Sequence, residues 1–320
     1  MVAMDSIIEV NHLTKRYKKA TTPAVDDISF DVAPGELFAF LGPNGAGKTT
    51  TISILTTTLA KTSGTVTIAG HDLDRDATEV RRNIGIIFQN PSIDEHLSGE
   101  ENIRLHAAIY GIYGYRPFYR SMPSEYRERV ERLAAIVGLG DDMGRPLRTF
   151  SGGMKRKLEV IRSLIHRPRV LFLDEPTSGL DPVSRHDLWA YLRTVREVDG
   201  TTIFLTTHYL EEAEEAERVC VIDHGRIAVI GTPDELKRRL LERAVLMDAA
   251  DRPGLEAELR GLGLRATEDA SGLLRVPYGD VTAQSLISRI ETPLAVLRVD
   301  EPSLEDAYVA LLRTPEEAVA

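Results

Sequence analysis

The sequence predicts an α/β fold with a mostly parallel sheet, followed by a smaller α+β unit. Short apolar runs bounded by turn residues, such as 37–41 and 170–173, are typical of buried parallel strands. Helical stretches of about 10 to 15 residues separate such runs, as crossover helices do in a parallel sheet. After Pro233 the order becomes βαββαβ, which predicts a ferredoxin-like unit of about 75 residues.

Each element of the larger part follows from a local pattern. Residues 7–13 and 28–32 alternate apolar and polar positions, as half-buried strands do, and Pro34 with Gly35 marks a turn after them. The other strands are short apolar runs, expected at 37–41, 64–68, 84–88, 170–173, 202–206 and 220–223. Helices are expected at 48–60, 99–111, 124–137 and 152–165.

The C-terminal unit is predicted in the same way. Its elements are a strand at 245–249, a helix at 254–262, a hairpin through Ser271 and Gly272, a helix at 283–290 and a strand at 295–299. A final helix opens at Ser303, where Asp306 completes a capping box. A chain of 320 residues suits about two domains, and we place them at 1–235 and 240–320.

Composition narrows the class of protein. Hydrophobic residues make up 42% and charged residues 28%, so the chain can bury a core and is not mainly disordered. A net charge of −10 argues against a general nucleic-acid coat, and nucleic acid is not an expected partner. A single cysteine, Cys220, excludes a disulfide framework and fits a reducing compartment. We see no signal peptide and no long apolar run, so we expect another chain to cross any membrane involved.

The first motif is a glycine-rich loop between the run 37–41 and a helix. It reads Gly42-Pro43-Asn44-Gly45-Ala46-Gly47-Lys48-Thr49. The glycines let backbone N–H groups form a nest for phosphate oxygens at a helix N-terminus. Lys48 would reach the β- and γ-phosphates, and the Thr49 hydroxyl would bind Mg²⁺. A chance glycine-rich turn is the alternative, and the strand–loop–helix context argues against it.

The second motif is a pair of acids at the end of the apolar run 170–173. Asp174 stands at the carboxyl end of a strand, where open α/β sheets bind ligands, and would hold Mg²⁺. Glu175 would orient or deprotonate an attacking water. The alternative is that the two acids only cap the following helix, and the phosphate loop upstream argues against that interpretation.

Between the two motifs lies a Ser-Gly-Gly turn that leads into a helix. It reads Phe150-Ser151-Gly152-Gly153-Met154-Lys155-Arg156. With the flanking motifs, residues of about 5–235 resemble the nucleotide-binding domain of ABC transporters. The resemblance implies a P-loop NTPase fold with an antiparallel β subdomain and a helical subdomain at about 90–165. It also implies that ATP and Mg²⁺ are the ligands.

The resemblance assigns further roles one residue at a time. Tyr17 matches the aromatic residue that stacks on adenine, and Thr50, next to the phosphate loop, is also expected to bind the nucleotide. Gln89 matches the glutamine that contacts Mg²⁺ and the attacking water. Asp181, in Ser178-Gly179-Leu180-Asp181, matches the D-loop, and His208 matches the switch histidine at the γ-phosphate. Taken alone, Tyr17, Gln89 and His208 each have a simple structural explanation, and it is their order along the chain that favours the site.

Two features depart from the common pattern of the family. The signature has Phe150 and Met154 where leucine and glutamine are usual, but its phosphate-contacting part, Ser151, Gly152 and Gly153, is intact. We therefore expect activity to survive. A similar stretch at Leu97-Ser98-Gly99-Glu100 lacks the second glycine and precedes no carboxylate strand, so we reject it as a second signature.

The resemblance also implies partners and a location. In the family, Ser151–Gly153 would bind the γ-phosphate held by a second subunit, so we expect a head-to-tail dimer with ATP between the two copies. The stretches around Gly152, Thr207 and Pro302 are most similar to daunorubicin-resistance-type exporter ATPases. This similarity implies a separately encoded membrane permease and a peripheral place on the cytoplasmic face of the cell membrane. Drug, lipid or glycolipid efflux is the expected function.

Other functions stay open at this stage. A soluble ABC ATPase for iron–sulfur assembly or DNA maintenance is the alternative, although the chain has no room for the long coiled coils of the DNA-maintenance class. The C-terminal unit is either a regulatory or dimer-supporting domain or a stabilising appendage. Six of the 19 aromatic residues lie between Tyr110 and Tyr126, which indicates either an interface or a locally packed loop.

Overall fold

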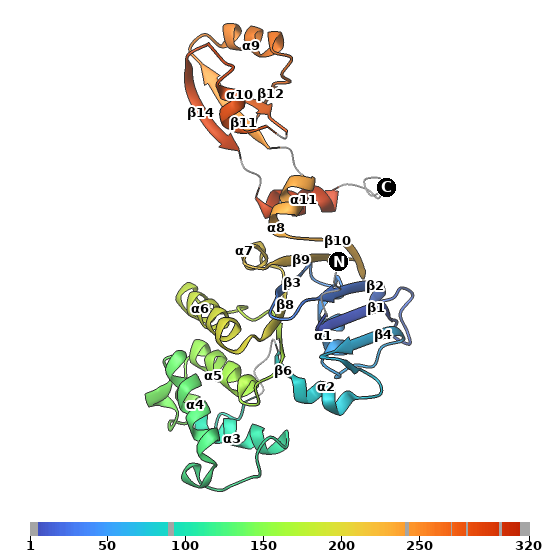
Figure 1. The fold of residues 1–320 in the computed structure, drawn as a ribbon, viewed down its shortest axis with the longest axis vertical. Helices are drawn as coiled ribbons and strands as arrows, with labels where there is room; N and C mark the ends of the chain where they lie inside the picture. The colour runs from blue at the N-terminus through green and yellow to red at the C-terminus, as the bar shows by residue number, and fades with distance from the viewer. Residues whose placement is uncertain are drawn as a thin grey trace. The chain divides into compact units, whose positions relative to one another are not determined.

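The structure, a computed structural model, describes residues 6–88, 93–240, 243–269, 271–279, 281–300 and 303–313. The chain divides into two compact units, Met1–Ile230 and Gly231–Ala320 (Figure 1). In the described part of the chain, no helix is both long enough and apolar enough to cross a membrane.

A six-stranded sheet forms the centre of the first unit. Its order is β10 (Arg226–Gly231), β9 (Arg218–Asp223), β3 (Leu37–Leu41), β8 (Thr202–Thr207), β7 (Val170–Asp174) and β6 (Ile84–Ile87). The pairs from β9 to β6 are parallel, and every residue of β3, β7 and β8 is buried. Burial on both faces explains why these strands read as continuous apolar runs. Helix α1 (Lys48–Leu55) packs against β7 and β8, and α7 (Leu210–Glu214) packs against β3 and β8.

A second sheet contributes the antiparallel part of the unit. Its order is β2 (Val25–Val32), β1 (Ile8–Lys15), β4 (Ser63–Ile68) and β5 (His71–Asp72). Phe30 on β2 lies 5.6 Å from Phe38 and from Phe40 and 6.0 Å from Phe204, measured between ring centroids. Phe172 joins the same cluster through Phe204 at 5.4 Å. These rings therefore bind the two sheets into one hydrophobic core.

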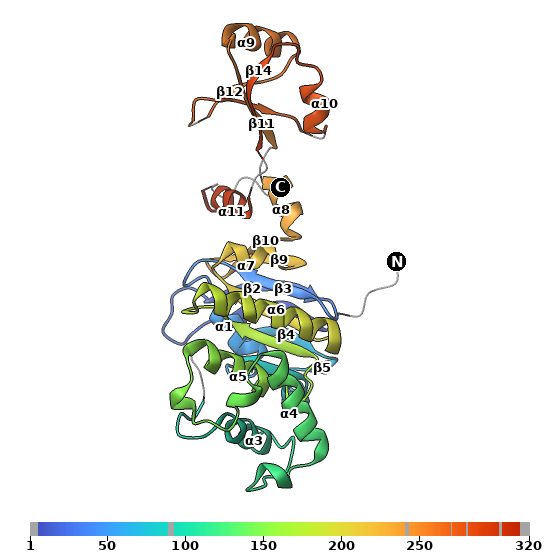
Figure 2. The same cartoon turned by 90° about the vertical axis from the view of Figure 1, so that its left-hand side faces the viewer.

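Helices between β6 and β7 form the helical subdomain (Figure 2). They are α3 (Gly99–Ile109), η1 (Tyr119–Ser121), α4 (Ser124–Ile136), η2 (Gly140–Asp142), η3 (Leu147–Thr149) and α5 (Gly152–Leu164). Helix α5 packs against α3, α4 and β6. The buried Arg129 guanidinium on α4 donates to Leu164 O at 3.1 Å and to Asp199 Oδ2 at 2.8 Å. Because Asp199 ends α6 (Pro182–Asp199), this contact holds the subdomain against the end of that helix.

Helix α1 ends earlier than the sequence pattern predicts. It stops at Leu55 instead of continuing to about residue 60. The Thr56 hydroxyl donates to Ile52 O at 2.8 Å, the Thr58 hydroxyl donates to Ser53 O at 2.8 Å, and Thr57 has a φ of 62°. Threonine hydroxyls that bond to the backbone compete with the helical pattern, so the threonine run terminates the helix. The chain then forms α2 (Ala77–Asn83) before it enters β6.

The second unit contains a four-stranded sheet in the order β12 (Thr267–Glu268), β13 (Leu274–Pro277), β11 (Ala244–Ala249) and β14 (Leu294–Asp300). With α9 (Arg252–Gly261) and α10 (Ala283–Ile287), these strands have the predicted βαββαβ order. The outer helices α8 (Pro233–Leu240) and α11 (Leu304–Arg313) pack against each other. The predicted capping box is confirmed, since Asp306 N donates to Ser303 Oγ and Ser303 N donates to Asp306 Oδ2, both at 3.1 Å.

We predict that Phe204→Ala lowers the free energy of unfolding of the first unit by about 3–5 kcal/mol. Phe204 is fully buried and contacts four other rings, so truncation leaves a cavity at the junction of the two sheets. Urea denaturation followed by circular dichroism would show a lower midpoint. Val198→Ala on α6 is the control, because that side chain is 62% exposed and should change the midpoint little. Equal midpoints for the two variants would contradict this view of the core.

Candidate functional site

Four predicted side chains meet at the carboxyl edge of the central sheet. Lys48 opens the helix after β3, Asp174 ends β7 and is followed by Glu175, and His208 follows β8. Strand β8 lies between β3 and β7, so the three loops leave the sheet side by side. Open parallel sheets bind ligands at this edge.

The glycine-rich loop has the backbone that a phosphate nest requires. Gly45 and Gly47 have φ values of 85° and 109°, and a Cβ on Gly47 would lie 2.5 Å from Ala24 O. A Cβ on Gly42 would lie 2.3 Å from Ile222 O, so this glycine is also required by close packing. Helix α1 begins directly after Gly47. The remaining loop residues that the sequence predicts lie in this turn and in the first turn of α1: Pro43, Asn44, Ala46, Thr49 and Thr50.

Lys48 is almost fully buried beneath this loop. Its ammonium group donates to Gly42 O at 2.7 Å and to Pro43 O at 3.1 Å, and lies 3.9 Å from Glu175 Oε1. Burial lowers the pKa of Lys48, while Glu175 and Asp174 oppose this shift. The ammonium group therefore lies between the loop carbonyls and the carboxylates. A phosphate bound there would offer it charged oxygens, which accept stronger hydrogen bonds than the neutral carbonyls of Gly42 and Pro43.

Asp174 and Glu175 differ in their surroundings. Asp174 is 4% exposed and accepts a hydrogen bond from the Thr206 hydroxyl at 2.6 Å. Burial raises the pKa of Asp174, and the Thr206 hydrogen bond and Lys48 counteract part of that shift. Glu175 has a φ of 46°, an uncommon conformation for glutamate, and its N–H donates to Thr206 O at 3.1 Å. This backbone turn directs Glu175 away from the strand, and its Oε1 lies 3.3 Å from His208 Nδ1.

The Ser-Gly-Gly turn forms a second group with the start of α6. Ser151 caps α5, and its hydroxyl oxygen accepts from Met154 N at 3.2 Å. Asp181 caps α6 and accepts from the Ser184 hydroxyl at 2.6 Å, which lowers the pKa of Asp181. A Cβ on Gly153 would lie 2.5 Å from Ser184 Oγ, so the glycine permits the close approach of the two helix starts. None of the hydrogen bonds described for this group reaches Lys48 or Glu175.

Comparison with known proteins shows the family of the chain. Residues 25–178 match the family model described as ABC transporter. The sequence is 38% identical to the daunorubicin/doxorubicin resistance ATP-binding protein DrrA of Streptomyces peucetius, and the match covers 97% of this chain and 93% of that relative. The chain belongs to the ABC transporter ATP-binding proteins. The doxorubicin resistance ATP-binding protein DrrA of Mycobacterium tuberculosis (strain ATCC 25618 / H37Rv) is 35% identical over 98% of this chain and 96% of its own.

Solved structures give the same family. A bacterial ABC transporter cassette whose structure is described as dimeric matches this ABC protein with a TM-score of 0.61. The two are 26% identical, and the match covers 70% of this chain and 98% of the cassette. The structure is thus an ABC ATPase fold, which binds ATP, and the first unit carries it.

Two further residues are expected at the nucleotide, and the structure describes Tyr17 but not Gln89. Tyr17 is 45% exposed, its hydroxyl oxygen lies 3.5 Å from Thr50 Oγ1, and Lys15 Nζ lies 5.4 Å from its ring centroid. Tyr17 therefore lies beside the first turn of α1, with ring surface open to solvent. Gln89 lies outside the described residues, so its predicted role stays a prediction.

Sequence reasoning missed a buried arginine that connects these parts of the ABC protein. Arg156 on α5 donates from Nε to Pro176 O at 2.9 Å and from Nη1 to Phe88 O at 2.6 Å. Nη1 also donates to Glu159 Oε2 at 3.0 Å, and both side chains of this pair are buried. Pro176 follows Glu175, and Phe88 precedes Gln89. The only signal in the sequence is an opposite-charge pair three positions apart on the inner face of a helix.

A second missed contact holds the same turn from the other side. The Thr177 hydroxyl donates to Glu212 Oε1, and both residues are buried. Glu212 lies on α7, four positions after His208, and its burial raises its pKa. The turn after Glu175 is therefore attached to α5 by Arg156 and to α7 by Thr177.

We predict that Arg156→Met lowers the free energy of unfolding by about 1–3 kcal/mol, because two carbonyls lose their buried donor and the buried Glu159 carboxylate keeps Arg162 but loses Arg156. Thermal or urea unfolding would measure the loss. The double variant Arg156→Met/Glu159→Leu should recover part of it, since it removes the buried carboxylate that has lost one of its arginine partners. Lys157→Met is the control, because its 2.9 Å pair with Asp187 lies at the surface. A loss in Arg156→Met no larger than in this control would contradict the interpretation.

Proposed function

We propose that this ABC protein hydrolyses ATP to drive export of a drug through a separately encoded membrane permease. The observation that carries the proposal is the convergence of Lys48, Asp174, Glu175 and His208 at the carboxyl edge of one parallel sheet. The relatives that span nearly the whole chain are drug-resistance ATP-binding proteins, which supports transport over iron–sulfur assembly or DNA maintenance.

The donor set suits MgATP. Gly45 has open space beside it in the loop ahead of α1, and Thr49 is exposed in the first turn of the helix, where phosphates could bind. Among the described residues no cluster of three or more acidic, histidine or cysteine side chains could enclose a metal ion. Mg²⁺ prefers one or two carboxylates with hydroxyl, water and phosphate oxygens. Asp174, Thr49 and Gln89 would hold it, and when bound it would neutralise phosphate charge.

Each side chain then has a defined task in hydrolysis. Lys48 binds the β- and γ-phosphates once its carbonyl contacts are exchanged for phosphate oxygens. Glu175 orients the attacking water and receives its proton, while His208, 3.3 Å from Glu175, fixes the carboxylate and approaches the γ-phosphate. Tyr17 stacks on the adenine ring. Catalysis is thus positioning plus charge stabilisation.

A second copy completes the site in this proposal. Ser151 and Gly152 are exposed at the start of α5, where backbone N–H groups and the helix dipole favour an anion. We propose that they bind the γ-phosphate held by the other subunit, with Asp181 beside them, in a head-to-tail dimer. The dimeric structure of a related cassette supports this arrangement. ATP would favour the closed dimer, and hydrolysis would release it.

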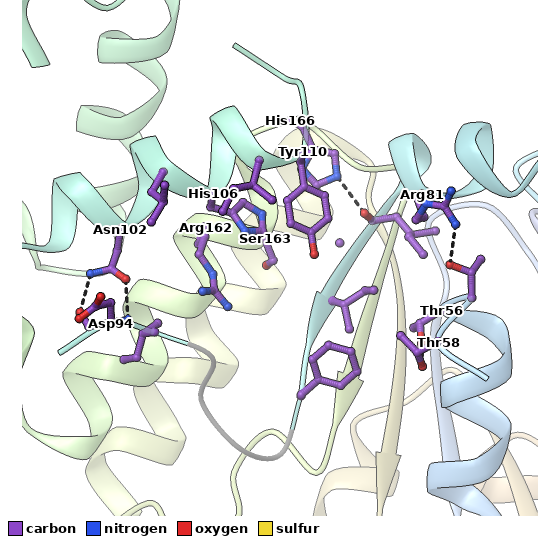
Figure 3. Close-up of a pocket in the computed structure, with 18 of the residues that line it drawn as sticks. Thr56, Thr58, Arg81, Asp94, Asn102, His106, Tyr110, Arg162, Ser163 and His166 are labelled. Carbon is purple, nitrogen blue, oxygen red and sulfur yellow. Dashed lines mark hydrogen bonds between the residues drawn. The ribbon is translucent and has the colours of Figure 1, made fainter. Parts of the chain in front are cut away.

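A groove beside β6 is the proposed contact with the permease (Figure 3). It encloses about 1020 Å³ and is lined by the threonine run after α1, by α2, β6, α3 and α5, and by the segments that follow β6. His106 and Tyr110 stack at 4.2 Å, and His166 Nε2 bonds to Ile84 O at 2.8 Å. Burial lowers the pKa of His106 to about 3, so its ring is neutral at physiological pH. The groove therefore suits a partly apolar helical segment, which we assign to the cytoplasmic side of the permease.

We predict that Thr206→Val raises the pH below which Mg²⁺-dependent ATP binding is lost. Protonated Asp174 is a poor metal ligand, so binding falls as pH falls through the pKa of Asp174. The Thr206 hydroxyl stabilises the ionised carboxylate, and its removal raises that pKa further. Fluorescent ATP titrations with and without Mg²⁺ across pH would show the shift.

Thr202→Val is the matched control for this experiment, because Thr202 is buried at the other end of β8 and accepts from Gly35 N. A midpoint that is the same in the wild type, Thr206→Val and Thr202→Val would show that Asp174 does not control metal-dependent binding.

We predict that Glu175→Gln binds ATP but hydrolyses it about 10²–10⁴-fold more slowly, because the amide cannot accept the proton of water. Phosphate release and light scattering would show slow turnover and accumulation of closed dimer. Glu211→Gln, an exposed acid nearby, is the control. Hydrolysis at a near-normal rate would refute the role of Glu175. In cells, Glu175→Gln should raise doxorubicin accumulation, and unchanged accumulation would argue against drug export.

A further inference from the structure

The loop between α3 and α4 is anchored at its base. We call residues 114–121 the tip loop. The buried Arg104 on α3 donates from Nη1 to Arg116 O at 2.7 Å. The Tyr119 hydroxyl donates to Arg127 O at 3.3 Å and to Glu131 Oε1 at 3.2 Å on α4. These contacts hold the loop to both flanking helices, so its conformation is set before any partner binds.

Aromatic rings beneath the loop reinforce this base. Tyr113 and Tyr119 pack edge-on against the fully buried Tyr126, with centroids 5.3 Å and 6.2 Å away. Met122, directly after the loop, is 3% exposed. Burial raises the pKa of Tyr119, so its hydroxyl stays protonated and keeps donating to α4. The buried Tyr126 and the half-buried Tyr113 and Tyr119 thus pack together at the base of the loop.

The outer side chains of the tip loop have the opposite character. Tyr115 is 67% exposed and Phe118 is 71% exposed. Arg116 and Arg120 beside them are also exposed, and the stretch 114–121 contains no acidic residue. A fixed loop therefore presents two aromatic rings and two arginines to solvent, on a chain whose net charge is −10. Such a combination is typical of a binding surface rather than of a solvated turn.

The loop lies near the groove proposed for the permease. Helix α3 holds Arg116 through Arg104. Its last residue, Ile109, and Tyr110 directly after it also line the groove. These two side chains are 71% and 51% exposed, and α3 packs against η1 of the loop. In Figures 1 and 2, α3 and the green segment after it lie together at the lower end of the drawing. If the groove faces a membrane protein, the tip loop is on the side of the molecule that faces the bilayer.

We propose that the tip loop binds the headgroup layer of an anionic membrane. This inference rests on the proposed function for its location, but the contact itself needs no nucleotide. Tyrosine and phenylalanine rings partition to the headgroup level, and arginine is attracted to anionic lipids. A chain of net charge −10 is otherwise repelled by such a surface, so the local charge of Arg116 and Arg120 selects this face.

The test measures co-sedimentation of the full chain with phosphatidylcholine vesicles, with and without phosphatidylglycerol. We expect the wild type to bind the anionic vesicles, to bind neutral vesicles weakly, and to be released by salt. Arg116→Gln/Arg120→Gln should bind about 30-fold more weakly, as expected for the loss of two arginines near an anionic surface. Tyr115→Ser/Phe118→Ser should also lose binding. Soluble ATP hydrolysis should stay unchanged in both double variants.

Val183→Ser/Val198→Ser on α6 is the matched control, because these side chains are 71% and 62% exposed but lie far along the chain from the loop. No binding of the wild type, or equal binding of all variants, would overturn the proposal. If instead the loop variants bind vesicles normally but no longer bind the purified permease in lipid-free detergent, the surface binds protein and the lipid assignment is wrong. Glu175→Gln should bind vesicles as the wild type does, so failure of the hydrolysis proposal would be recognised separately.

Discussion

The parallel pairing of β3, β8 and β7 is the constraint on which the candidate site depends. Leu41 pairs with Thr207, and Asp174 pairs with Thr206, so the three strands end at the same level. The segments that follow the three strands must therefore lie together. They carry Lys48, the carboxylates Asp174 and Glu175, and His208. The aromatic cluster around Phe204 fixes these strands against the second sheet, and the site is rigid because its support is the core itself.

The turn after Glu175 is where the parts of the first unit meet. Thr206 holds the backbone of Glu175, Arg156 holds Pro176 from the signature helix, and Glu212 holds Thr177 from the helix after His208. Arg156 also holds Phe88, the last described residue before Gln89. Displacement of α5 would therefore also move the turn after Glu175, because the planar guanidinium of Arg156 donates hydrogen bonds in fixed directions. This network gives a physical route by which docking at the helical subdomain can reach the carboxylate.

Much of this site could be predicted because its residues lie in contiguous motifs. Lys48 and Asp174 each follow an apolar run that only a buried strand explains, and Gly47 has a conformation that only glycine adopts easily. The end of α1 could not be placed, since it depends on which way threonine hydroxyls bond. Arg156 and Glu212 were missed for a similar reason. Their partners lie on other elements, and no pattern along the chain reveals a contact that only folding creates.

The sequence likewise could not show which of the aromatic residues between Tyr110 and Tyr126 are packed and which are exposed. Their clustering favoured either a packed loop or an interface, and composition could not separate the two. The structure divides the set: Tyr113, Tyr119 and Tyr126 pack together, whereas Tyr115 and Phe118 are exposed. The packed rings are what makes the exposed ones significant. An exposed ring on a flexible loop can fold back onto the protein, but one whose base is fixed by Arg104 and Tyr119 stays exposed until a partner covers it.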